Sequence, residues 1–343
     1  MAKKKVKTFD ELLEEEFGEA IFDEKKDDLD KEEAIVAIKT GSISLDVSTG
    51  VGGIPLRRFT EIYGPEGSGK TTLALSVCRS VLKDGDEVLY IDPEQGVDMS
   101  LVRGVIGEDF NKDSFLLIKP ETMEDSLRIA EAGIQSKRFK LIILDSIGSM
   151  SPIKVKEDAL TDDNVALLSR RMTIFVSRNL YDLRRSDIAF IGINQIRDVI
   201  GSYIKMFESP GGHAWKHAAS LRILLSKAMD IEQDGEKIGI GTRFTIKKNK
   251  LARPFRTHFI PIIFGKGVDS VRDTVEFATM LGILIKAGGW YKFEGETLGI
   301  GMDKTLEFLN NNPIILDKIN TSCYNSIKDD SFLVDEDIEI VEE

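Results

Sequence analysis

One short motif constrains the fold of this chain more than any other feature of its sequence. The pattern G-x-x-x-x-G-K-[ST] is satisfied by Gly64, Pro65, Glu66, Gly67, Ser68, Gly69, Lys70 and Thr71, with Thr72 directly after it. An apolar run precedes the motif and a helical pattern follows it, which is the context of a phosphate-binding loop. In such a loop, backbone N–H groups and the lysine hold the phosphates, and the threonine hydroxyl binds Mg²⁺. The motif therefore predicts binding of ATP together with Mg²⁺.

Strands and helices alternate on both sides of this motif. Apolar strands are predicted at 58–63, 87–92, 140–145 and 188–194, and helices at 70–82, 123–136 and 165–184. Such alternation, with strands that are apolar on both faces, is typical of a doubly wound α/β domain. Later strands at 220–225, 243–248 and 258–264 have no helices between them, so we expect them to extend the sheet as antiparallel strands. Residues from about 269 onward are expected to form a small α+β domain.

The composition of the chain is that of a globular protein. Of the 343 residues, 42% are hydrophobic and 30% are charged. No apolar run approaches the roughly 18 residues that span a bilayer, so we expect a cytoplasmic protein with no membrane partner. The net charge of −12 is concentrated at the ends, because residues 1–33 carry −6 and residues 328–343 carry −7, which leaves 34–327 at +1. Overall acidity therefore does not exclude a polyanionic ligand on the body of the chain. We expect the acidic tail to be solvated, with a regulatory contact as the alternative.

Candidate catalytic groups follow the ends of the other predicted strands. Asp145, with Ser146 after it, ends an apolar strand and supplies the second carboxylate that a phosphate-binding loop needs beside its metal ion. Glu94 and Asp92 both lie at the end of another strand, where ligands bind in this class of fold, and either could activate water. The amide of Gln195 could sense the γ-phosphate, or it could be a plain polar strand terminus.

An ordered series of short matches resembles the bacterial RecA recombinases. Around the phosphate-binding loop, the matching segments are 38–46, 52–55, 61–66, 91–94, 144–146, 194–197, 211–212, 248–250 and 286–291. They occur in the order of the family and cover roughly residues 34–312. The resemblance implies a DNA-dependent ATPase that forms helical filaments on single-stranded DNA with ATP between neighbouring protomers. It also implies homologous pairing and strand exchange with double-stranded DNA.

The same resemblance divides the chain into four parts. Residues 1–40 correspond to an N-terminal oligomerisation helix, a linker and a strand. Residues 41–268 correspond to a RecA-type ATPase core with a mixed, mainly parallel sheet and DNA-binding loops. Residues 269–327 correspond to a small α+β C-terminal domain, and residues 328–343 form the acidic tail. The N-terminal helix would carry Phe9, Leu12, Leu13 and Phe17 on one face, and the resemblance implies that this stripe docks on the next protomer.

Several candidate residues take their roles from the resemblance. Glu94, rather than Asp92, matches the catalytic glutamate. Gln195 matches the γ-phosphate sensor that leads into the second DNA loop. Lys248 and Lys250 match lysines that reach the ATP of a neighbouring protomer, where cations can face developing phosphate charge.

DNA is expected to lie against two loops, at about 152–164 and 198–212. The residues that match DNA contacts of the family are Val165, Arg171 or its neighbour Arg170, Arg178, Arg197, Ile200, Gly211 and Gly212. The arginines on the helix after the first loop would contact phosphates, and the paired glycines would donate backbone N–H groups to phosphate. The two apolar residues correspond to wedges between groups of bases.

Some positions depart from the family pattern. Asp98 matches an adenine contact, but Leu101 stands where an aromatic side chain usually stacks on the base. His217 replaces an aromatic residue that packs between protomers, and both DNA loops lack the usual composition. Two alternative functions are therefore kept: a ring-forming motor or helicase of the same fold, and a DNA-binding regulatory filament with weak ATPase activity.

Overall fold

The computed structural model describes residues 35–152, 164–198, 207–233 and 235–326. The chain divides into two compact units, Met1–Ile35 and Val36–Glu343, and the elements below all belong to the second unit. The predicted N-terminal helix, most of both DNA loops and the acidic tail lie outside the described residues. No helix in the described ranges has the length and apolar composition that crossing a membrane would require.

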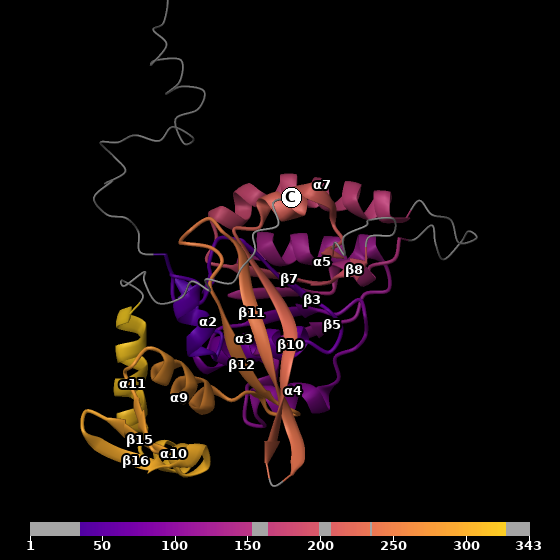
Figure 1. Ribbon diagram of the computed structural model, residues 1–343. Helices are drawn as coiled ribbons and strands as arrows, with labels where there is room; N and C mark the ends of the chain where they lie inside the picture. Colours follow the sequence, from indigo (N-terminus) through magenta and orange to yellow (C-terminus); the bar gives the residue numbers. More distant parts are fainter. Residues whose placement is uncertain (1–34, 153–163, 199–206, 234, 327–343) are drawn as a thin grey trace, which may run out of the picture. The chain divides into compact units, whose positions relative to one another are not determined.

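A nine-stranded sheet forms the centre of the second unit (Figure 1), in the order β13-β12-β11-β10-β3-β7-β6-β4-β5. In chain order the strands are β3 (Phe59–Gly64), β4 (Val88–Ile91), β5 (Phe115–Ile118), β6 (Leu141–Asp145), β7 (Ala189–Gln195), β10 (Leu221–Gln233), β11 (Glu236–Asn249), β12 (Thr257–Ile263) and β13 (Gly267–Val268). In this order, each pair of adjacent strands from β10 through β5 is parallel. The other three strands pair antiparallel. The predicted mixed, mainly parallel sheet with an antiparallel extension is confirmed.

Helices cover both faces of this sheet, as Figure 1 shows. One face carries α3 (Lys70–Lys83) and α4 (Met99–Ile106), and the other carries α5 (Met123–Ser136), α7 (Asn164–Arg184) and α8 (Gly212–Ala218). Alternate residues of a strand point to opposite faces. In β6, Leu141 and Ile143 accordingly pack in the core beside α3, whereas Ile142 and Leu144 pack in the core beside α5 and α7. Burial on both faces explains why the parallel strands are continuously apolar.

Smaller elements surround the sheet. The short helix α2 (Ile43–Ser48) lies in the chain between β1 (Ala37–Ile38) and β2 (Ile54–Pro55), and these two strands pair antiparallel. The strand predicted within residues 1–40 is therefore present as β1. A second antiparallel pair, β8 (Arg197–Asp198) and β9 (Phe207–Glu208), flanks the undescribed part of the second DNA loop.

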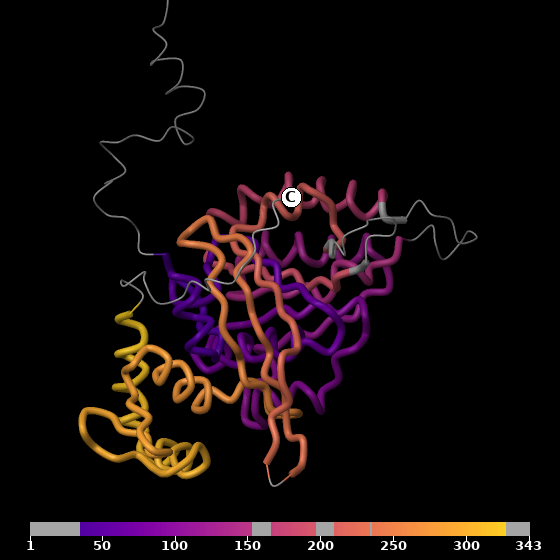
Figure 2. Tube along the Cα trace, viewed as in Figure 1, coloured from indigo at the N-terminus to yellow at the C-terminus, as the bar shows by residue number. Residues whose placement is uncertain are grey.

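A small C-terminal domain with its own sheet follows β13. Its elements are α9 (Ser270–Met280), β14 (Ile285–Ala287), β15 (Trp290–Phe293), β16 (Glu296–Ile300), α10 (Gly301–Asn311) and α11 (Pro313–Asn325), coloured orange to yellow in Figure 2. Their apolar side chains form a third core cluster, which also includes Ile43 and Val47 of α2. The C-terminal domain thus shares its apolar core with α2. The exact domain boundaries stay predictions.

Candidate active site

The phosphate-binding loop joins β3 to α3 through a glycine that no other residue could easily replace. Gly69 is the N-cap of α3, has φ of 87° and caps the helix without a side chain. A Cβ atom at this position would lie 2.4 Å from Ile262 of β12. The left-handed backbone strongly favours glycine here, and any side chain would also have to displace the tip of the Ile262 side chain. The loop therefore presents backbone N–H groups at the start of α3, where the helix dipole favours an anion.

Lys70 follows this glycine and is 8% exposed. Its Nζ donates to the carbonyl oxygens of Gly64 at 3.0 Å and Pro65 at 2.7 Å. Burial lowers the pKa of Lys70, while the nearby carboxylates, led by Asp145, act in the opposite direction. The ammonium group is thus held inside the loop, beside the acidic groups of the site.

A cleft of about 300 Å³ lies beside this loop, and its walls come from the ends of several strands. The lining residues are Glu66, Gly67, Gly69, Lys70, Thr71, Thr72, Asp92, Glu94, Gly96, Val97, Leu101, Asp145, Ser146 and Gln195. The cleft therefore brings together most of the nucleotide-binding residues predicted from the sequence. Of the others, Gly64, Pro65 and Ser68 form the loop itself, whereas Asp98 lies outside this lining.

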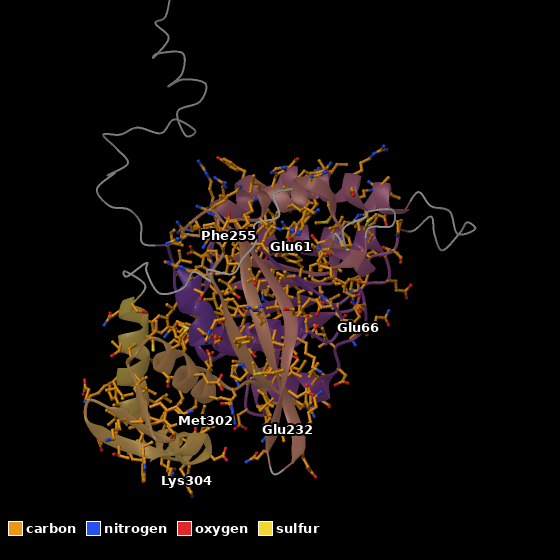
Figure 3. All side chains as sticks on the ribbon, viewed as in Figure 1. Glu61, Glu66, Glu232, Phe255, Met302 and Lys304 are labelled. Carbon is orange, nitrogen blue, oxygen red and sulfur yellow. The ribbon has the colours of Figure 1, made fainter. Side chains whose placement is uncertain are left out.

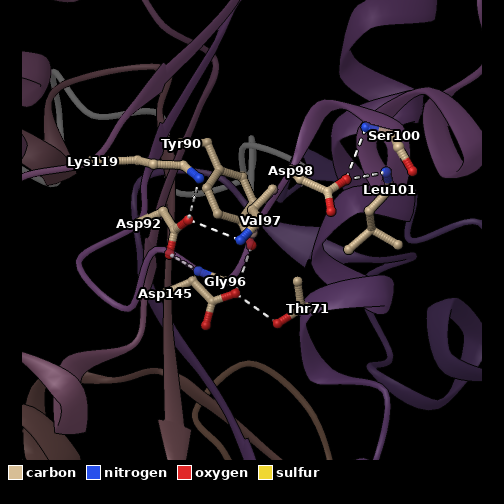
Figure 4. Close-up of polar contacts among 10 residues, drawn as sticks. All are labelled: Thr71, Tyr90, Asp92, Gly96, Val97, Asp98, Ser100, Leu101, Lys119 and Asp145. Carbon is tan, nitrogen blue, oxygen red and sulfur yellow. Dashed lines mark hydrogen bonds and ion pairs between the residues drawn. The ribbon is translucent and has the colours of Figure 1, made fainter.

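Asp145 and Thr71, the predicted metal ligands, contact each other in the cleft. The Thr71 hydroxyl donates to Asp145 Oδ2 at 2.7 Å, and the hydroxyl of Tyr90 donates to the same oxygen at 2.7 Å. Figure 4 shows these three residues together. Burial raises the pKa of Asp145 to about 6, although both hydrogen bonds act to lower it. This role of Tyr90 was not predicted from the sequence, because a tyrosine within an apolar strand is typical of an ordinary core residue.

The carboxylate of Asp145 and the hydroxyl of Thr71 suit Mg²⁺ as ligands. The ion prefers hard oxygen ligands and usually takes one or two carboxylates together with phosphate oxygens and water. Within the described part of the chain, no group of three or more His, Cys, Asp or Glu residues could hold a metal ion by itself. A bound cation would also offset the burial that disfavours ionised Asp145. The arrangement therefore suits a cation that arrives with a nucleotide.

Glu94 lies in the cleft with both carboxylate oxygens engaged by side chains from neighbouring strand ends. Its Oε1 accepts from Gln195 Nε2 at 3.1 Å, and its Oε2 accepts from the Ser146 hydroxyl at 3.1 Å. The side chain is nevertheless exposed. A carboxylate that is oriented by two donors and open to solvent can act on a water molecule.

Asp92, the competing candidate, has a different environment. It is 1% exposed and accepts from the backbone N–H groups of Gly96 at 3.2 Å and Val97 at 2.9 Å. Lys119 Nζ lies 3.7 Å from Asp92 Oδ2, as Figure 4 shows. These contacts hold the turn after β4 in place. The geometry therefore favours Glu94 over Asp92 as the group that acts on water.

Asp98 begins α4 rather than lining the cleft. Its Oδ1 accepts from the backbone N–H groups of Ser100 at 2.9 Å and Leu101 at 2.8 Å (Figure 4). The bond from Leu101 is the main cause that lowers the pKa of Asp98. As an N-cap, Asp98 fixes the helix that carries Leu101 into the cleft.

Lys248 and Lys250 are held at the C-terminal end of the short helix α8. Lys248 Nζ donates to the carbonyl oxygens of Lys216 at 2.6 Å and His217 at 3.1 Å, and Lys250 Nζ donates to that of His217 at 2.8 Å. Cations at a helix C-terminus satisfy its unpaired carbonyls. Burial, followed by the charge of Lys250, lowers the pKa of Lys248 to about 8. Neither lysine is part of the lining of the cleft in its own chain.

The predicted DNA-binding arginines Arg170, Arg171 and Arg178 lie on α7. Arg171 and Arg178 line a groove of about 230 Å³ between α5 and α7, together with Arg128, which the sequence did not single out. Arg171 Nη2 lies 3.9 Å from Glu124 Oε1. Arg170 is exposed but lies outside the lining of this groove, so the structure groups Arg171 with Arg178.

The other predicted DNA contacts surround the second loop. Gly211 and Gly212 have φ of 101° and 75° at the start of α8, and a Cβ on Gly212 would lie 2.8 Å from Ser169 Cβ on α7. Val165 is in the first turn of α7 and Arg197 is in β8, but their side chains are not described. Ile200 lies outside the described residues.

Comparisons with known proteins agree with this geometry. Residues 4–269 match the family model of the RecA N-terminal domain, and residues 273–328 match that of the RecA C-terminal domain. The chain is 36% identical over 288 residues to Protein RecA of Syntrophus aciditrophicus, which covers 84% of this chain and 83% of that protein. It is 36% identical over 291 residues to Protein RecA of Acinetobacter baylyi, with 84% and 82% covered. The crystal structure of the RadB recombinase has the same fold, with a TM-score of 0.50 and 21% identity over 67% of this chain and 98% of that chain. The chain therefore belongs to the RecA family of ATP-dependent DNA recombinases.

Proposed function

We propose that this protein assembles as a filament on single-stranded DNA, hydrolyses ATP with Mg²⁺ between neighbouring protomers, and exchanges strands between homologous DNA molecules. The observation that carries the proposal is the hydrogen bond between Glu94 and Gln195 in the cleft. It joins the candidate catalytic carboxylate to the last residue of β7, the strand that leads toward the second DNA loop. Nucleotide and DNA would therefore act on the same short piece of backbone.

The nucleotide phosphates would bind along the loop at the start of α3. Lys70 would exchange the Gly64 and Pro65 carbonyls for phosphate oxygens, which are stronger partners for an ammonium group. Thr71 and Asp145 would hold Mg²⁺, which neutralises phosphate charge when bound.

Hydrolysis would depend on Glu94. Its carboxylate can orient a water molecule and accept its proton, while Ser146 and Gln195 keep the side chain in place. When a γ-phosphate is present, the Gln195 amide can donate to it as well as to Glu94. The position of Gln195 would then report which nucleotide is bound.

Lys248 and Lys250 would act on the ATP of a neighbouring protomer. Both are held on the C-terminal end of α8, and its N-terminal end carries the proposed DNA contacts Gly211 and Gly212. A single short helix would thus connect bound DNA to cations that face the next nucleotide. On α7, Arg171 and Arg178 lie two helical turns apart and would contact successive phosphates of the DNA strand.

Strand exchange tests the proposal directly. Circular single-stranded DNA and homologous linear duplex DNA are mixed with the protein, with and without ATP, and joint molecules are resolved on a gel. We expect ATP-dependent joint molecules and nicked circular product. ATP-dependent unwinding of the duplex without homologous partner DNA would instead support a ring-forming motor. DNA binding without exchange would support the regulatory filament.

Mixing two inactive variants tests the shared site. Lys248→Ala with Lys250→Ala leaves Glu94 intact, whereas Glu94→Gln leaves both lysines intact. In an equimolar random filament with one-way interfaces, about one interface in four pairs an intact Glu94 with intact lysines. We expect the DNA-stimulated ATPase of the mixture to recover toward a quarter of the wild-type rate. A mixture that stays as inactive as its components would contradict a site shared between protomers.

A further inference from the structure

A fully buried carboxylate lies one strand away from the proposed γ-phosphate sensor. Glu61 is in the middle of β3, is 0% exposed, and is labelled in Figure 3. Its Oε1 accepts from Asn194 Nδ2 at 2.8 Å, and its Oε2 accepts from Nε of Arg222 on β10. A buried carboxylate requires such partners, because an unpaired charge away from water is strongly disfavoured.

Both partners of Glu61 also reach the end of the second DNA loop. Asn194 Nδ2 donates to the carbonyl oxygen of Pro210 at 3.0 Å, and Arg222 Nη2 lies 3.3 Å from the Ser209 hydroxyl, to which it donates. Ser209 and Pro210 directly precede the paired glycines that start α8. One carboxylate therefore connects the end of β7 with the returning end of the loop.

The positions of these partners place the cluster between two nucleotide sites. Asn194 directly precedes Gln195, whose amide reaches Glu94 in the cleft of the same chain. On the other side, Arg222 lies opposite Lys248 in the pairing of β10 with β11. The cluster thus contacts the strand end that faces the chain's own ATP and the strand that carries a lysine proposed to face a neighbour's ATP.

Stability alone is a poor account of such a cluster. A buried ion pair contributes little net stability compared with apolar side chains of the same volume, because desolvation opposes the attraction of the charges. What a buried polar network does supply is a defined geometry, since every donor must meet its acceptor. A fixed geometry is useful where two loops have to respond to each other.

We propose that Glu61 is a positioning residue which, through Asn194 and Arg222, holds Gln195 and the Ser209–Pro210 end of the second DNA loop in one register, so that the nucleotide controls DNA affinity. The inference rests on the proposed function, because it needs ATP in the cleft and DNA at the loop. Without the cluster, each part would still bind its ligand, but the two ligands would no longer affect each other.

The test compares single-stranded DNA affinity in ATP and in ADP. Fluorescence anisotropy of a labelled oligonucleotide gives the dissociation constant of the full-length protein in each nucleotide. The ratio of the DNA affinity in ATP to the DNA affinity in ADP measures the coupling. Asn194→Ala removes both amide contacts and leaves Glu61 paired with Arg222. Glu61→Gln is the second variant and keeps the side-chain volume. We expect the ratio to fall about tenfold or more in each, with ATP affinity within about twofold of wild type.

Asn179→Ala is the matched control. Asn179 is also a buried asparagine, 1% exposed, and its Nδ2 donates to the Phe175 carbonyl at 2.8 Å within α7. Loss of this buried amide should lower the melting temperature and leave the ratio of the DNA affinities in ATP and in ADP unchanged.

The outcomes separate the inference from the proposed function. A wild-type ratio near one would contradict nucleotide-controlled DNA binding itself. A large wild-type ratio that is unchanged in a folded Asn194→Ala or Glu61→Gln protein would overturn the inference alone. An equal fall in the ratio of the Asn179→Ala control would reduce the cluster to a purely structural role and would overturn it too.

Discussion

The nucleotide cleft and the contact between α2 and the C-terminal domain both contain buried carboxylates, and they use them differently. Burial raises the pKa of Asp145 in the cleft to about 6, and that of Asp46 and Asp273 at the contact to about 7. The physical cause is the same in both regions, since removing a carboxylate from water disfavours its charged form. The partners of these carboxylates differ.

At the contact, donors from the chain itself surround each carboxylate. Asp46 accepts from the Thr40 N–H at 2.8 Å, the Thr40 hydroxyl at 2.7 Å and the Tyr324 hydroxyl at 2.9 Å. Asp273 accepts from the hydroxyls of Ser42 at 2.8 Å and Ser44 at 2.7 Å, and from the Ser44 N–H at 3.1 Å. These bonds link the segment around α2 to α9 and α11.

In the cleft, by contrast, Asp145 shares its space with Thr71, Lys70 and Glu94, all of which line a cavity large enough for phosphates. The comparison teaches that burial of a carboxylate does not by itself mark an active site. What marks the cleft is the combination of a buried carboxylate with a cation, a hydroxyl and open volume. Changes in the cleft should therefore alter activity, whereas changes at the contact should alter stability and leave activity nearly unchanged.

Lys70→Ala should have the largest effect. Two charge-assisted hydrogen bonds to phosphate contribute about 3 to 6 kcal/mol together, so ATP affinity should fall by about 1000-fold. The fold should persist, because the buried lysine contacts loop carbonyls and the cleft rather than an apolar core. Titration with a fluorescent ATP analogue and circular dichroism measure the two properties. ATP affinity within threefold of wild type would remove Lys70 from the site.

Glu94→Gln should abolish hydrolysis while ATP still binds. Loss of a general base lowers the rate by about 100-fold or more, whereas the amide still fits between Ser146 and Gln195. Phosphate release in the presence of single-stranded DNA measures the rate, and nucleotide titration measures binding. Asp92→Asn is the control, and it should loosen the turn after β4 with a smaller effect on the rate. The reverse ranking of the two variants would transfer the catalytic role to Asp92.

Asp145→Asn should separate activity from stability within the cleft. Hydrolysis should fall about tenfold or more and need more Mg²⁺, because a charged ligand of the cation is lost. Because the folded-state pKa of Asp145 is raised from 3.8 to about 6, wild-type stability declines as pH rises through that range. The variant cannot ionise, so it should lack this part of the decline. Melting temperatures from pH 4 to 8 and a Mg²⁺ titration of ATPase activity test both statements.

Asp46→Asn should have the smallest effect on activity, with DNA-stimulated ATPase within about twofold of wild type. The folded-state pKa of Asp46 is raised from 3.8 to about 7, so the folded protein binds more protons than the unfolded chain between these pH values. Stability therefore falls as pH rises from about 4 to 7, by up to about 1.4 kcal/mol per pH unit for one group. The variant should show a shallower decline in thermal denaturation. An unchanged slope, or lost ATPase activity, would break the distinction between the two regions.

Elements with a strong local pattern were predictable from the sequence, and those with a weak one were not. The helix at 123–136 was predicted at the bounds that α5 has in the structure. The helix α4 was not predicted, because eight residues are too few to show a clear helical period. The strand β5 was also missed, and it lies at the edge of the sheet and is only partly buried, unlike the equally short β4. Local pattern identified Glu94 and Asp92 as equal candidates, and the family resemblance favoured Glu94. Both residues line the cleft, but their contacts differ, because Asp92 is buried and holds a turn whereas Glu94 is exposed and oriented by two side chains.

The sequence by itself determined the phosphate-binding loop, the fold class and the family, because each depends on residue types at fixed spacing along the chain. The tertiary structure alone decided which distant side chains meet. Tyr90 with Asp145, Glu61 with Asn194 and Arg222, and the lysines with the end of α8 join residues that lie far apart in sequence. Such contacts follow from strand order and register, which local periodicity does not encode. The same is true of burial, which raises the pKa of Asp145 and of Asp46 alike, while their neighbours determine that only Asp145 lines the cleft.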